Sequence, residues 1–151
     1  KKYELDNFDY DDDVDKMFGQ TIEVYMESIG QVIPEYLVNF DFLKKYMEQN
    51  GFNVESIKTN DMYSAKVKAG IDVTLQSCHT GFIDGYFIEG HVPHDAVTKL
   101  LTEKPNIKGI TVPGMPAGIN VPGMEVTTER AKFDVLAVNA DGSTFIWKQY
   151  E

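Results

Sequence analysis

The chain has 151 residues, of which 42% are hydrophobic and 25% charged, so it is long enough to form one globular domain with its own core. Its 24 acidic and 14 basic side chains give a net charge of −10, which argues against general binding to nucleic-acid phosphates or anionic lipid. One cysteine excludes an internal disulfide, and no apolar run approaches the roughly 18 residues of a membrane span. We therefore expect neither nucleic acid nor a membrane as a partner.

The first half of the chain predicts an acidic arm followed by the start of a single domain. Residues 1–20 are rich in aspartate and glutamate, which is typical of a solvated arm, and the domain is expected over residues 21–151. The alternating residues Thr21–Tyr25 predict a strand. An apolar stripe from Pro34 to Asn50-Gly51 predicts a helix.

The next elements follow in close succession. Residues Phe52–Ile57 predict a second strand. Asp61 is the expected N-cap of a short helix that runs to Ala69 and is closed by Gly70.

Two Asp-Gly pairs in the second half predict β-hairpins, because this dipeptide between alternating strands is the strongest short-range hairpin signal. The predicted hairpins are Thr80–Ile83 with Tyr86–Glu89, and Phe133–Ala140 with Ser143–Tyr150. Between them we expect a helix over Asp95–Glu103. Residues 105–130 contain many prolines and glycines and are expected to be rich in loop.

This order of elements predicts the fold class. The strand–helix–strand start requires a parallel crossover, and the later hairpins add antiparallel strands. The prediction is an α/β domain with a mixed sheet, flanking helices and a C-terminal β-hairpin, as in a thioredoxin-like fold.

Soft metal-binding side chains are concentrated between residues 76 and 124. This segment holds the only cysteine, all three histidines and two of the six methionines: Cys78, His79, His91, His94, Met115 and Met124. Thiolate, thioether and imidazole are the ligands that Cu(I) prefers. Each of the two methionines follows a Pro-Gly turn, so the backbone of the turn sets its direction.

Each candidate also has an ordinary structural interpretation. Cys78 is either a ligand or a small buried apolar residue, and Met115 and Met124 are either ligands or gap-fillers beneath a loop. His91 is either a ligand or a cap of the turn in which it lies, and we interpret His94 as a surface residue. On a straight strand, Cys78 and His79 would point to opposite faces, so both reach one site only where the chain turns.

Residues 56–151, approximately, resemble an uncharacterised bacterial family known as domain of unknown function 411. The resemblance lies in Ser77-Cys78-His79-Thr80, Asp84-Gly85-Tyr86, Glu89-Gly90-His91-Val92-Pro93, Val112-Pro113-Gly114-Met115-Pro116, Pro122-Gly123-Met124-Glu125 and Phe133-Asp134-Val135-Leu136. It implies a thioredoxin-like domain that binds a soft metal, most plausibly copper, with no established enzymatic activity. It also implies a copper-handling partner and a periplasmic location.

The chain departs from that family at one point. The family carries a Cys-Gly-Cys-Cys loop after its first strand, whereas residues 27–38 contain no cysteine. If those cysteines are primary ligands, the chain has lost most of its site. An alternative function is therefore a metal-free interaction module.

Residues 17–52 are similar to the C-terminal part of mRNA cap guanine-N7 methyltransferases. The similarity lies in Met17-Phe18-Gly19 and Pro34-Glu35-Tyr36-Leu37-Val38, and it implies that Glu35 lies at a cap-binding pocket. It would imply a fusion with a junction near residues 50–56, and a cytoplasmic protein if this part is native. No glycine-rich loop for S-adenosylmethionine precedes it, so methyl transfer by this chain alone is not expected.

The sequence thus predicts a non-catalytic protein that sequesters or transfers copper. The expected ligands are Cys78, His91 and one or both of Met115 and Met124, with His79 as a further candidate. The metal-free module and the methyltransferase fragment remain alternatives.

Overall fold

The computed structural model describes residues 21–27, 43–59 and 61–151 of the chain. Within these residues, one mixed sheet has the strand order β2-β1-β3-β4-β5-β6-β7. The strands are β1 (Thr21–Glu27), β2 (Asn53–Thr59), β3 (Thr80–Ile83), β4 (Tyr86–Glu89), β5 (Gly109–Thr111), β6 (Phe133–Val138) and β7 (Thr144–Tyr150). The helices are α3 (Met62–Ala69), α4 (His94–Glu103) and the short 3₁₀ helix η1 (Val73–Leu75), and residues 43–49 are also helical.

Two parallel strand pairs set the architecture. β1 is parallel to β2 and β4 is parallel to β5, and the remaining neighbours are antiparallel. The first crossover contains a helix at residues 43–49, which is the described part of the helix predicted from Pro34; its predicted start lies outside the described residues. The second crossover contains α4. Residues 105–130, which were predicted to be rich in loop, also contain the strand β5, which the sequence did not indicate. Three residues are too few to give a periodic signal, and pairing with β4 and β6 creates the strand.

Local signals in the sequence explain most of the element boundaries. Asp61 accepts a hydrogen bond from the backbone N–H of Ser64 at 3.0 Å and so caps α3, and Gly70 ends it with a φ of 75°. The first hairpin turns at Asp84 and Gly85, whose φ angles of 51° and 84° are both positive, as a type I′ turn requires.

The second hairpin has a longer turn than predicted. Its strand β6 ends at Val138 rather than Ala140, and the backbone N–H of Asn139 donates to the carbonyl of Ser143 at 2.8 Å. The three residues inside this bond include Gly142 with a φ of 89°, which is typical of a three-residue hairpin loop.

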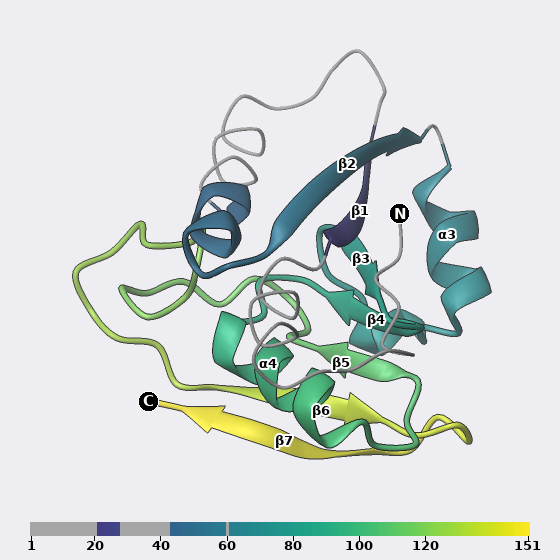
Figure 1. Ribbon diagram of the computed structural model, residues 1–151. Helices are drawn as coiled ribbons and strands as arrows, with labels where there is room; N and C mark the ends of the chain where they lie inside the picture. The colour runs from purple at the N-terminus through teal and green to yellow at the C-terminus, as the bar shows by residue number, and fades with distance from the viewer. Residues whose placement is uncertain (1–20, 28–42, 60) are drawn as a thin grey trace.

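Alternating side chains give the sheet a core on each face. In Figure 1, α4 lies in front of the sheet over β5 and β6, whereas α3 lies at its other side. The core on the α4 face also includes residues from the helix at 43–49, and its sheet members include Ile22, Ile88, Ile110, Val135 and Ala137. The core beneath α3 and η1 is made of Ile71, Leu75, Phe87 and Val138, with Phe82 and Leu136 packed against it. Helices therefore cover both faces, as parallel pairing requires.

The predicted α/β class, with a mixed sheet and a C-terminal hairpin, is confirmed. The finer thioredoxin-like assignment and the division into arm and domain stay predictions. The suggested junction near residues 50–56 overlaps β2, which pairs in one sheet with β1. The acidic arm and Glu35 lie outside the described residues. In the part of the chain that is described, no helix has the length and apolarity needed to cross a membrane.

Candidate metal centre

A bend at Cys78 brings the two adjacent donors Cys78 and His79 to the same place. The bend lies between η1 and β3, and the Sγ atom of Cys78 is 3.0 Å from Nδ1 of His79. On a straight strand the two side chains would point to opposite faces, and the bend allows both to reach one site. His91 comes from the end of β4, where the chain turns toward α4, and its ring centroid is 5.0 Å from that of His79.

These three side chains form a compact donor cluster. One ligand atom from each of Cys78, His79 and His91 lies within 4.8 Å of the other two. Two donors on one metal ion lie at most about 4.3 Å apart, since metal–sulfur bonds are about 2.3 Å and metal–nitrogen bonds about 2.0 Å. Three donors in a plane around one ion lie closer together, at about 3.5–3.7 Å, so side-chain rotations that close the cluster by about one ångström would place all three on one ion.

The tautomer of His91 is fixed by the loop between β5 and β6. Nδ1 of His91 is 2.6 Å from the carbonyl oxygen of Pro122. A carbonyl can only accept, so Nδ1 carries the proton and donates it. In the neutral ring, Nε2 then holds the lone pair that a metal requires, and such a hydrogen bond is typical of metal-binding histidines.

Burial keeps the cluster uncharged. It raises the pKa of the Cys78 thiol to about 11 and lowers the pKa of His91. Burial also lowers the pKa of His79 well below its usual value, and electrostatic repulsion from Lys66 and from any proton on His91 lowers it further. Cys78 and His79 are therefore a neutral thiol and a neutral imidazole at pH 7. A cysteine nucleophile would instead need a lowered thiol pKa.

The two Pro-Gly-Met turns are each tied to the cluster through the backbone. The hydroxyl of Ser77, the neighbour of Cys78, donates to the carbonyl of Gly114 at 2.7 Å. The second turn supplies the Pro122 carbonyl that holds His91. Their methionines differ in exposure, since Met115 is 47% exposed and Met124 only 8%. The role of each as a ligand stays a prediction.

His94 stands apart from the cluster. It is the first residue of α4, and its ring packs edge-on against Tyr46 at a centroid distance of 5.6 Å. The group of side chains able to hold a metal, within the described residues, includes the other two histidines but not His94.

Sequence reasoning missed a buried ion pair beneath the cluster. Lys66 of α3 and Glu89 of β4 form a salt bridge, and their side chains are 8% and 0% exposed. Burial raises the pKa of Glu89, and Lys66 and the hydrogen bonds from Ser77 and Thr80 act in the opposite direction. A lysine in a helix is ordinarily expected to be exposed to solvent. Only Glu89, an acidic residue in the fully buried strand β4, could have indicated this pair.

Acid is expected to destabilise the fold through the two cluster histidines. The pKa values of His79 and His91 are lowered in the folded protein, whereas the unfolded chain titrates near 6.5. The unfolded state therefore binds more protons as the pH falls below 6.5, and stability falls with it. Each histidine contributes at most about 1.4 kcal/mol per pH unit. Urea denaturation at pH 7.5, 6.5 and 5.5 measures the effect, and a flat profile would contradict it.

Comparison with known proteins agrees with this picture. The fold and the cluster define a small α/β protein with a candidate site for a soft metal. Residues 75–124 match the family described as a protein of unknown function, DUF411. A solved structure of copper resistance protein CopG, form 2, is 33% identical, with a TM-score of 0.75 over 87% of this chain and 98% of that chain. Form 1 is also 33% identical, with a TM-score of 0.74 over 86% and 96%.

The chain therefore belongs to the family of copper resistance protein CopG. The family match is narrower than the predicted residues 56–151. No curated protein matches the chain. The resemblance of residues 17–52 to cap methyltransferases finds no support in these comparisons, and that alternative is not favoured.

Proposed function

We propose that the chain binds one Cu(I) ion through Cys78, His79 and His91 and thereby sequesters or transfers copper. The observation that carries this proposal is the convergence of one sulfur and two imidazole donors within 4.8 Å. Thiolate and imidazole together suit Cu(I), and the related solved structures are named for copper resistance.

The loop between β5 and β6 gives the proposed site a means of exchange. Its two Pro-Gly turns carry Met115 and Met124, whose thioethers are further Cu(I) ligands in this proposal. Met115 is exposed and is therefore accessible to a partner that delivers or removes the ion. Met124 is buried and is not accessible to such a partner. This difference in exposure supports transfer rather than permanent storage.

An anaerobic competition titration with a Cu(I) chelator tests the proposal. We expect one equivalent of Cu(I) to bind per chain with submicromolar affinity, and Zn(II) to bind more weakly. X-ray absorption of the loaded protein should show sulfur and imidazole neighbours of copper. Micromolar or weaker Cu(I) binding, or tighter binding of Zn(II), would rule out the proposal.

The affinity for Cu(I) is expected to rise about tenfold per pH unit between pH 6.5 and 9. The pKa of the Cys78 thiol is raised to about 11, so the metal must displace one proton throughout this range. The histidines contribute little to the slope, because burial lowers the pKa of each ring below its usual value of 6.5. Titration at four pH values, corrected for the chelator's own protonation, measures the slope. An affinity independent of pH would mean that no thiol proton is released.

A further inference from the structure

The buried pair of Lys66 and Glu89 lies directly beneath the segment that carries Cys78 and His79. We propose that this pair positions that segment for metal binding, an inference that rests on the proposed function. Neither residue is a candidate ligand; both act through Ser77 and Thr80, the residues on either side of the two donors.

Among the described residues, the side chains of the pair form hydrogen bonds, apart from the one between them, only with Ser77 and Thr80, which flank the donors. The Lys66 ammonium donates to the carbonyl of Ser77 at 3.1 Å and to the hydroxyl oxygen of Thr80 at 2.9 Å. The Glu89 carboxylate accepts from the backbone N–H of Ser77 at 2.7 Å and from the hydroxyl of Thr80 at 2.6 Å. Cys78 and His79 lie between these two anchored residues.

The contacts to Ser77 fix the orientation of Cys78. The carbonyl of Ser77 belongs to the planar peptide group that leads into Cys78, so the bond from Lys66 sets the plane from which the thiol projects. Glu89 holds the preceding peptide group through its N–H. The backbone also approaches closely here, because a Cβ atom at Gly90 would lie 2.7 Å from the Ser77 hydroxyl oxygen.

Stability alone does not account for this pair. Removing two charges from water is costly, and apolar residues of similar volume often hold a core at least as well. The helix α3 turns Lys66 inward while Tyr63 and Val67 are 72% and 53% exposed, which reverses the usual amphipathic arrangement. The hydrogen bonds of the ion pair hold two backbone groups and one hydroxyl in fixed orientations. Apolar residues cannot orient these groups.

Two variants separate positioning from stability. Lys66→Met combined with Glu89→Leu removes every side-chain hydrogen bond from the pair to Ser77 and Thr80 but fills the space. We expect this double variant to fold, as judged by circular dichroism, and to bind Cu(I) about 10- to 100-fold more weakly.

Glu89→Gln keeps the shape of the side chain at position 89. Its oxygen can accept hydrogen bonds from Lys66 and Ser77, and its amide can donate to Thr80. We expect it to retain affinity within about threefold, as rescue by a conservative change should.

Amide hydrogen exchange gives a second readout that does not depend on the metal. In the metal-free double variant, the Ser77 N–H should exchange faster, while amides of α4 exchange as in the unaltered protein. If the unaltered protein fails to bind Cu(I), the proposed function is wrong, but faster exchange at Ser77 would still support positioning.

If the double variant does not fold, Thr80→Val is used in its place, because it keeps the ion pair. We expect Thr80→Val to bind Cu(I) about tenfold more weakly. Unchanged Cu(I) affinity in the folded contact-removing variant, or unchanged Ser77 exchange, would overturn the inference.

Discussion

Replacing Cys78 with serine is expected to weaken Cu(I) binding by at least about 100-fold, because the hydroxyl is a hard, weakly acidic donor in place of a soft thiolate. His79→Gln and His91→Gln should each weaken binding by about 10- to 100-fold, since each removes one of three donors that lie within 4.8 Å. Competition titration under anaerobic conditions measures all three variants against the unaltered protein.

The chain provides its own control in His94. This histidine lies outside the donor cluster and packs against Tyr46, so His94→Gln should leave Cu(I) affinity unchanged. Met115→Leu and Met124→Leu preserve volume and remove only the thioether, so they report whether either sulfur binds the metal. Equal losses in His91→Gln and His94→Gln would mean that copper binds to histidines unspecifically, and the proposed site would be wrong.

Replacing Lys66 alone with methionine is expected to cost about 3–5 kcal/mol of the free energy of unfolding. The substitution leaves the Glu89 carboxylate, whose side chain is 0% exposed, without its cation. The hydrogen bonds from Ser77 and Thr80 remain but do not neutralise it. Urea denaturation at pH 7.5 measures the loss.

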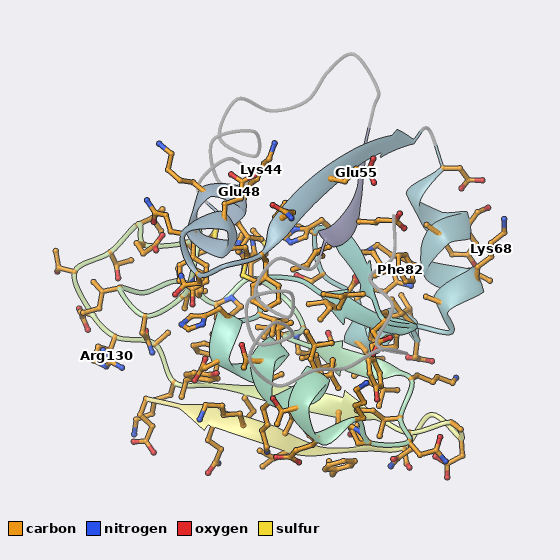
Figure 2. The ribbon with its side chains drawn as sticks, viewed as in Figure 1. Lys44, Glu48, Glu55, Lys68, Phe82 and Arg130 are labelled. Atoms are coloured by element: carbon orange, nitrogen blue, oxygen red, sulfur yellow. The ribbon has the colours of Figure 1, made fainter. Side chains whose placement is uncertain are left out.

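Lys68 is the matched control on the same helix. It is exposed and points away from the sheet (Figure 2), so Lys68→Met should change stability by no more than about 0.5 kcal/mol. Adding Glu89→Leu to Lys66→Met should restore most of the lost stability, because no unpaired charge then remains. If Lys66→Met alone is as stable as Lys68→Met, the ion pair contributes nothing to the fold.

The sequence predicted well those features that depend on neighbouring residues. Asp84-Gly85 and the Asp61 cap produce their turn and helix start through backbone geometry within a few residues, and both appear as expected. The segment containing the donors was also visible, because cysteine and histidine are rare in this chain. The approach of Cys78 to His79 depends on the bend at Cys78, which the spacing of the two residues alone could not predict.

Features that depend on distant residues could not be predicted. Lys66 and Glu89 are 23 residues apart on a helix and a strand, and no periodicity marks them as partners. The strand β5 exists because β4 and β6 lie on either side of it. In both cases a tertiary contact, rather than a local preference, decides the structure.

The long connection between β5 and β6 has a consequence for how such chains diverge. These strands are antiparallel neighbours, which a turn of a few residues could join, yet residues 112–132 separate them. The pairing of β5 with β6 does not require so long a connection. The connection does supply the Pro122 carbonyl, which accepts a hydrogen bond from His91. A related chain that no longer bound metal could have a shorter connection. Among related chains, we therefore expect the long connection in those that retain the cysteine and histidines.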